Sequence, residues 1–184
     1  MDGIYLLALL TLLSNIMLIL CLGLRLWEKI AKKVIWKRKE EYLVNESYKL
    51  ILIVSGIATF GSLYISEIRG FTPCRLCWFQ RIFMYPQFVI MTVMVLKKLK
   101  DVFPYTLILS LIGGLIAIYH YFLQINPNPY APCGDVGFSV SCSERFFTYF
   151  GYITIPWMSF SAFVIIFLVS FLNLKNSKKI VLDH

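Results

Sequence analysis

Five stretches without Lys, Arg, Asp or Glu constrain this chain more than any other feature of its sequence. They cover residues 4–24, 50–66, 82–96, 102–124 and 146–174. A membrane-spanning helix needs about 20 apolar residues, and the third stretch reaches that length only when residues 78–81 are included. Because 59% of the 184 residues are hydrophobic, too few polar side chains remain to cover a water-soluble domain. We therefore expect an all-α membrane protein with five spans.

The positions of the basic residues predict the orientation of these spans. Of the 18 Lys and Arg residues, 14 lie in three segments, at 25–49, 97–100 and 175–179. The positive-inside rule assigns such segments to the cytoplasm, so residues 69–77, residues 126–145 and the N-terminus face outward. The net charge of +8 therefore encodes topology, and we expect membrane lipid rather than nucleic acid as its partner. The first stretch lacks the basic start of a signal peptide, which favours a retained helix.

Four of the five cysteines form two pairs in the two loops that are predicted to face outward. Cys74 and Cys77 make a C-x-x-C motif, and Cys133 and Cys142 lie in the second loop. An oxidising compartment permits disulfides in both loops. A C-x-x-C motif alone fits a redox pair, half of a zinc site or a structural bridge. Cys21 lies inside the first stretch without a partner, and we interpret it as a small buried hydrophobe.

The residues around the C-x-x-C motif favour redox chemistry. Pro73 ends the preceding segment and a helix is predicted from Trp78 onward, so Cys77 lies near a helix N-terminus, where the helix dipole favours a thiolate. Arg81 follows four residues later on the same helix face, and a buried cation beside a cysteine pair indicates function. His120 lies near the outer end of the fourth stretch. We expect it to donate to, or relay a proton for, a small polar group near Arg81.

Two other interpretations of the cysteine pairs stay open. All four cysteines could hold a metal ion, although the outward topology and the lack of a nearby histidine in the sequence disfavour this, so no metal is expected. Alternatively, the chain is a structural membrane protein whose two disulfides are inert.

Together these motifs resemble the DsbB family of disulfide bond formation proteins. Residues 74–81 read CRLCWFQR, which is similar to the family's C-x-x-C-x-x-x-R signature in its BdbC-type form. The segments at 120–124, 142–145 and 151–156 are also similar, and the resemblance covers about residues 49–174. In vitamin K epoxide reductase-like enzymes, which do related chemistry, the C-x-x-C is expected after the loop pair, whereas here it comes first.

The resemblance implies a fold, an activity and a location. The fold would be a DsbB-like four-helix transmembrane bundle over residues 48–174, with an additional transmembrane helix and basic cytoplasmic loop in residues 1–47 and a basic cytoplasmic tail in 175–184. The activity would be that of a thiol:quinone oxidoreductase in the bacterial inner membrane. It would reoxidise an extracytoplasmic, DsbA-like thioredoxin-fold oxidase, and the electrons would pass to ubiquinone or menaquinone. Arg81 and His120 would bind the quinone.

The resemblance also implies a role for each paired cysteine. Cys133 would form the mixed disulfide with the partner, and Cys142 would then exchange with Cys74. Cys77 would be the thiolate next to the quinone ring. The chain departs from the family pattern in its additional first span and in the short spacing between Cys133 and Cys142.

Overall fold

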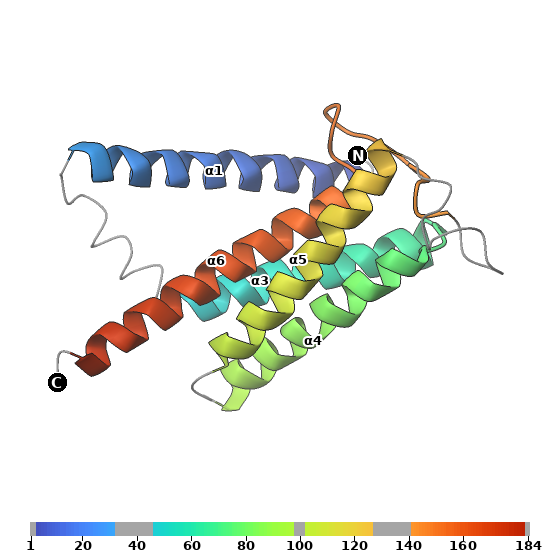
Figure 1. Ribbon diagram of the computed structural model, residues 1–184. Helices are drawn as coiled ribbons and strands as arrows, with labels where there is room; N and C mark the ends of the chain where they lie inside the picture. Colours follow the sequence, from blue (N-terminus) through green and yellow to red (C-terminus); the bar gives the residue numbers. More distant parts are fainter. Residues whose placement is uncertain (1–2, 32–45, 98–101, 127–140, 183–184) are drawn as a thin grey trace.

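The computed structural model describes residues 3–31, 46–97, 102–126 and 141–182, and most of these residues are helical (Figure 1). The elements are α1 (Gly3–Ala31), α3 (Ser47–Leu63), the π-helix η1 (Tyr64–Ile68), α4 (Arg75–Lys97), α5 (Phe103–Ile125) and α6 (Ile155–Leu182). Five helices within these ranges are long and apolar enough to cross a membrane. The described residues form no strand, only an isolated bridge between Tyr149 and Ile153. The prediction of an all-α membrane protein is confirmed.

Helices α3, α4, α5 and α6 pack into a bundle, and α1 lies against one side of it (Figure 1). The core of the bundle is apolar and takes residues from all four helices. Its fully or almost fully buried members include Ile51, Met84, Met91, Phe103, Phe163 and Ile166. Helix α1 crosses α6 near its own N-terminal end and diverges from the bundle farther along, where Met17, Leu20 and Trp27 are exposed. An apolar exposed helix face is what a membrane helix presents to lipid.

The closest approach inside the bundle is between α5 and α6. Gly113 lies directly against the ring of Phe163, so a Cβ atom at position 113 would overlap that ring. Small residues let membrane helices approach closely, and dispersion contacts then hold them together. A buried hydrogen bond of 2.8 Å between the hydroxyls of Thr106 and Ser170 joins the same two helices farther along. A tight packing contact and a buried hydrogen bond thus join this pair of helices.

One helix begins before its predicted start, and another begins inside its uncharged stretch. Helix α4 begins at Arg75, before the predicted start near Cys77. Helix α6 begins at Ile155, although the uncharged stretch begins at 146. Pro156 in its first turn suits a helix start, and the preceding turn contains Phe150 and Gly151 with positive φ of 51° and 79°. Apolar composition alone does not mark these starts, because turn residues here are also apolar.

Both cysteine-containing segments lie at the same end of the bundle as the N-terminus of α1 (Figure 1). The ring of Tyr5 lies 5.8 Å from that of Tyr149, which belongs to the turn before α6. Gly3 lies against the ring of Tyr64 in η1, so that a side chain at position 3 would have no room. The N-terminus of α1, the C-x-x-C segment and Cys142 therefore lie at one end of the bundle, and the side of the membrane that this end faces stays a prediction.

Candidate functional site

Cys74 caps the N-terminus of α4. Its carbonyl oxygen accepts a hydrogen bond from the backbone N–H of Trp78 at 3.2 Å, and its sulfur accepts one from the backbone N–H of Cys77 at 3.4 Å. The first N–H groups of a helix have no partner inside the helix, so a side-chain acceptor at this position stabilises its start. The Cys74 sulfur therefore fills the place that a Ser or Asp oxygen takes in most helices.

The sulfurs of Cys74 and Cys77 lie 3.2 Å apart, and both residues are free thiols in this structure. A disulfide would bring these atoms to about 2.0 Å, a short movement from the observed distance. Cys74 is only 3% exposed, whereas Cys77 is partly exposed. The pair is thus positioned to form and break a disulfide, with Cys74 facing the protein interior.

His120 connects the cysteine pair to the second cysteine segment. Its Nε2 atom lies 3.5 Å from the sulfur of Cys74 and 3.1 Å from the carbonyl oxygen of Cys142. Its Nδ1 atom lies 2.9 Å from the side-chain nitrogen of Gln80. An amide nitrogen only donates, so Nδ1 is the acceptor and the ring proton is on Nε2. His120 therefore donates toward both the Cys74 sulfur and the Cys142 carbonyl oxygen.

The electrostatic surroundings of Cys74 favour its thiolate. Hydrogen bonding with the Cys77 thiol, and then with His120, outweighs the effect of burial and lowers the pKa of Cys74 to about 4. The position at the N-terminus of α4 acts in the same direction, because the helix dipole is positive there. In the dithiol form, Cys74 is therefore the deprotonated sulfur at neutral pH. A thiolate with a low pKa is also a good leaving group in thiol–disulfide exchange.

Cys142 lies beside this pair, in one apolar cluster with Cys74, Leu76 and Leu123. It is 2% exposed and disulfide-bonded. Polar contacts fix the segment that follows it to the end of α5. Arg145 donates from Nε to the carbonyl oxygen of Gln124 at 2.8 Å, and the Gln124 side chain donates to the carbonyl oxygen of Glu144 at 3.0 Å. These contacts hold the Cys142 segment against the C-x-x-C motif.

Arg81 is buried at the other side of Cys77, one turn farther into α4. Its Nε donates to the hydroxyl of Ser62 at 3.0 Å, and Nη2 donates to the Ser62 carbonyl oxygen at 3.2 Å. The guanidinium lies over the ring of Trp78, at 5.1 Å from the ring centroid. These partners stabilise a cation at a depth where an unpaired charge would be costly. Arg81 thus joins α4 to the end of α3.

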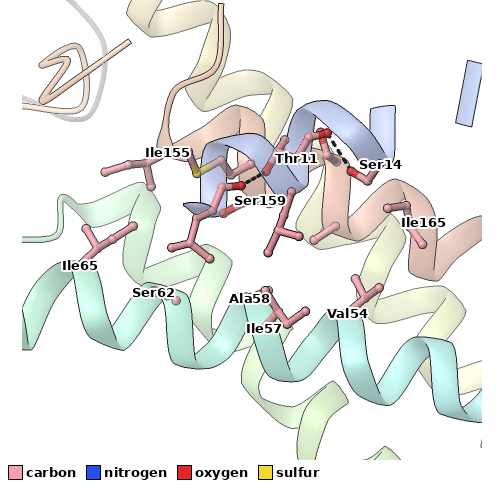
Figure 2. Close-up of a pocket in the computed structure, with 16 residues that line it drawn as sticks. Thr11, Ser14, Val54, Ile57, Ala58, Ser62, Ile65, Ile155, Ser159 and Ile165 are labelled. Atoms are coloured by element: carbon pink, nitrogen blue, oxygen red, sulfur yellow. Dashed lines mark hydrogen bonds between the residues drawn. The ribbon is translucent and has the colours of Figure 1, made fainter. Parts of the chain in front are cut away.

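Ser62 also lines an apolar cavity of about 250 Å³ between α1, α3 and α6 (Figure 2). Aliphatic side chains make most of its wall, among them Val54, Ile57 and Ile165. Ser62 also accepts hydrogen bonds from Arg81, so this pair of side chains connects the cavity wall to the helix that carries Cys77. An apolar cavity of this kind next to a redox pair suits a lipophilic molecule that is dissolved in the bilayer.

The structure brings together five of the six residues predicted for the site. Cys74, Cys77, His120 and Cys142 form the cluster described above, and Arg81 lies next to it in α4. Cys133 lies outside the described residues. Within the described residues His120 contacts Cys74, Cys142 and Gln80, and its predicted role toward a polar group near Arg81 stays a prediction.

The sequence analysis missed Gln80, Ser62 and Gln124. Gln80 and Gln124 are 4% and 5% exposed, and each bonds to a residue far away in the chain. A signal for them existed, because an uncharged amide within an apolar span needs a partner inside the protein. Ser62 gave no such signal, since a serine in a membrane helix commonly bonds to its own backbone.

The same cluster has the dimensions of a metal site. The sulfurs of Cys74 and Cys77 and a ring nitrogen of His120 all lie within 4.8 Å of one another. The expectation that no histidine lies near the cysteines was therefore wrong, because residues 46 positions apart meet here. Thiolate and imidazole are ligands that zinc accepts, so metal binding has to be tested against redox chemistry.

Comparison with known proteins places these features in a family. The model of the family "Disulfide bond formation protein DsbB" matches residues 45–173, which include α3 to α5, most of α6 and the whole cysteine site. Helix α1 precedes the match. No solved structure matches the chain significantly.

Curated bacterial relatives carry the same kind of name. A "Probable disulfide formation protein C" of Halalkalibacterium halodurans is 46% identical over 122 residues, which are 65% of this chain and 86% of the relative. A "Probable disulfide formation protein C 1" of Bacillus anthracis is 38% identical over 140 residues, 76% of this chain and 97% of the relative. The "Disulfide bond formation protein C" of Bacillus subtilis is 42% identical over 116 residues, 62% of this chain and 82% of the relative.

Proposed function

We propose a function for this chain, which belongs to the DsbB family of disulfide bond formation proteins. In this proposal it is the membrane oxidase that returns a DsbA-like thiol oxidase to its disulfide form and passes the electrons to a quinone. The observation that carries this proposal is the position of the Cys74 sulfur. It lies 3.2 Å from the Cys77 sulfur and shares the Nε2–H of His120 with the Cys142 carbonyl oxygen. One sulfur is thus adjacent to both redox partners.

The proposed exchange starts in the second cysteine segment. A thiolate of the partner attacks Cys133 of a Cys133–Cys142 disulfide, which forms a mixed disulfide and releases Cys142 as a thiolate. The second thiol of the partner then resolves the mixed disulfide, so the partner loses two electrons and two protons. The segment gains the two electrons. We assign Cys133 to this outward role because Cys142 is buried and fixed against the C-x-x-C motif.

Cys142 then attacks the sulfur of Cys74 in the Cys74–Cys77 disulfide, and Cys77 leaves as a thiolate. In the return step the Cys133 thiolate attacks Cys142, the Cys133–Cys142 disulfide reforms and Cys74 leaves, and the low pKa of Cys74 assists its departure. His120 stabilises the negative charge on Cys74 in that step by donating from Nε2. The electron pair is then on the C-x-x-C dithiol, where Cys77 lies on the side of Arg81.

The residues beside Cys77 fit a quinone. The cavity next to Ser62 is apolar, and Arg81 is a cation that could stabilise a developing negative charge. When bound, a quinone would accept the two electrons and two protons that leave the dithiol as the Cys74–Cys77 disulfide reforms. Arg81 and Ser62 would orient the ring, and the aliphatic wall would exclude water. We assign the protein to the bacterial cell membrane, with its cysteine end outside the cytoplasm.

The test is a quinone-reduction assay with the full-length protein in detergent or lipid. A reduced thioredoxin-like partner and a short-chain ubiquinone or menaquinone analogue are added, and quinol formation is followed by absorbance. We expect one quinol for each two partner thiols oxidised. If neither quinone type is reduced with any thioredoxin-like partner, the proposal is wrong.

A metal site is the competing proposal, because three ligand atoms lie within 4.8 Å of one another. The two proposals differ in the state of the thiols. A structural metal would hold Cys74 and Cys77 as unreactive thiolates and would be present in stoichiometric amount in protein purified without reductant. A redox pair would be metal-free and would cycle between thiol and disulfide in thiol-trapping experiments.

A further inference from the structure

We propose that α1 forms one wall of the quinone site and that the hydroxyl of Ser161 in α6 donates a hydrogen bond to a carbonyl oxygen of the quinone. This inference rests on the proposed function and deepens it, because α1 lies before the region that the family model matches. In this chain, the helix that precedes the family region would therefore be part of the electron-acceptor site rather than only a membrane anchor.

The N-terminal part of α1 is packed against three separate segments of the bundle. Tyr5 makes an edge-to-face contact with Tyr149, and Gly3 lies against the ring of Tyr64. One turn farther along, Leu7 lies so close to Gly61 that a Cβ atom there would be 3.1 Å from its methyl carbons. A helix held by contacts on α3, η1 and the turn before α6 can form a defined wall.

One face of α1 is directed toward the cavity of about 250 Å³ (Figure 2). Leu7, Leu10, Thr11 and Ser14 line it, and the spacing of three and four residues places them on the same helix face. Leu13 lies outside this face, because it is 54% exposed and does not line the cavity. Without α1, this side of the cavity would open directly to lipid.

Ser161 is a buried donor that a ligand with a hydrogen-bond acceptor would satisfy, and it borders both this cavity and a second one lined by Asn15 and Trp157. Its side chain is 5% exposed and lines the cavity, yet its Oγ has no hydrogen-bond partner within the described part of the chain. The neighbouring hydroxyls behave differently, since Thr11 donates to the Leu7 carbonyl oxygen at 2.9 Å and Ser14 to the Thr11 carbonyl oxygen at 2.8 Å. A buried hydroxyl without a partner is unfavourable, and a ligand oxygen would satisfy it.

The chemistry of the cavity favours a quinone over a lipid acyl chain. An acyl chain would fill the apolar wall but would offer no acceptor to Ser161. A quinone ring offers both an apolar face and two carbonyl oxygens. The cavity also adjoins Ser62, which holds Arg81 and so connects it to the cysteine site. The cavity therefore combines the apolar surface, the donor and the position that an electron acceptor requires.

Photoaffinity labelling of the unmodified chain tests the wall directly. A quinone with a photoreactive group is bound, illuminated and located by peptide mass spectrometry. We expect label on α1 within residues 7–14, in addition to α3 or α6. Two variants are then compared by equilibrium quinone binding. Thr11→Phe fills the cavity and should weaken quinone binding about tenfold, whereas Leu13→Phe on the exposed face should leave it unchanged.

Ser161→Ala tests the hydrogen bond, and infrared spectroscopy of the bound quinone gives a readout apart from turnover. We expect the carbonyl stretching band to move toward that of a free quinone, and affinity to fall about fivefold. If the quinone is reduced but labels only α3 and α6, and Thr11→Phe binds like Leu13→Phe, the role of α1 is wrong while the proposed function stands. If the unmodified chain neither binds nor reduces a quinone, the proposed function itself fails.

Discussion

The cysteine site and the cavity are built in opposite ways, although the hydrogen bond from Arg81 to Ser62 connects them. At the cysteine site, polar groups are bonded to one another across the fold: His120 contacts Gln80, Cys74 and Cys142. In the cavity, the wall is aliphatic and the buried Ser161 hydroxyl has no partner in the described residues. Thiol exchange needs sulfurs that are held in place, whereas a diffusing acceptor needs a site whose polar atoms are still free.

The two residues that connect these regions belong to different ones. Arg81 belongs to the helix that carries Cys77, and its hydrogen bonds go to Ser62 in the cavity wall. A change on the cysteine side should therefore alter thiol chemistry without altering affinity for the acceptor. A change in the α5–α6 contact, which supports both regions, should affect both.

Cys77→Ser should abolish quinone reduction, with a loss on the order of 10³-fold or more, because the C-x-x-C disulfide can no longer form. Quinone binding should persist, since the cavity is unchanged. Turnover is measured as quinol formation, and Cys21→Ser in α1 is the matched control, which should keep full activity. A Cys77→Ser variant with turnover close to that of the unmodified protein would contradict the role given to Cys77.

Gly113→Ala should destabilise the bundle by about 1–3 kcal/mol, because the added methyl group overlaps the buried ring of Phe163. Gly114→Ala is the control, since a Cβ atom at 114 would meet Phe163 at an ordinary distance of 3.6 Å. Thermal unfolding in detergent measures both. Thiol exchange and quinone binding should decline together in Gly113→Ala. A decline in only one of them would show that the α5–α6 contact does not support both regions.

His120→Ala should raise the pKa of Cys74 from about 4 by about one pH unit, because a donor to the thiolate is lost. The thiolate is present above the pKa and is protonated as the pH falls through it, so the variant loses its thiolate at a higher pH. Thiolate absorbance near 240 nm, measured after reduction of the C-x-x-C pair, gives the midpoint. Tyr119→Ala, at an exposed neighbouring position, is the control and should leave the midpoint unchanged. An unchanged midpoint in His120→Ala would show that His120 does not stabilise the Cys74 thiolate.

Gln80→Leu should have the smallest effect, raising the pKa of Cys74 by less than His120→Ala does. The amide fixes the ring proton of His120 on Nε2, and its loss should cost about 0.5–1.5 kcal/mol. Nitrogen NMR of the histidine ring reports the tautomer directly. Gln87→Leu removes a buried amide from the same helix without touching His120 and should leave the tautomer unchanged. An unaltered tautomer in Gln80→Leu would show that Gln80 does not position the ring.

The sequence predicted the architecture well because a bilayer leaves few choices. Hydropathy locates spans, and all five predicted spans are helices in the structure. The same reasoning did not fix where α6 begins, because the turn residues that precede Ile155 are also uncharged and mostly apolar. The basic residues predicted that the N-terminus and both cysteine segments lie on one side of the membrane, because the positive-inside rule places the three basic segments on the other side.

The sequence predicted only those parts of the candidate site whose residues lie close together along the chain. The C-x-x-C motif and Arg81 are neighbours on one helix, so their proximity follows from sequence spacing. The meeting of His120 with Cys74 depends on how α5 packs beside α4, which no local pattern encodes. The same holds for the bonds from Arg81 to Ser62 and for the cavity that α1 closes.

The cap of α4 has a consequence for how this protein could be observed. The atom that stabilises the start of the helix is the sulfur of Cys74, the same atom that exchanges disulfide bonds in the proposed function. A thiolate is a stronger hydrogen-bond acceptor than a disulfide sulfur, so oxidation weakens the cap and reduction strengthens it. The backbone amide of Cys77 therefore reports the redox state, and its hydrogen exchange should be slower in the reduced protein. Hydrogen exchange at this amide would therefore report electron transfer as a change in local backbone order, without any added probe.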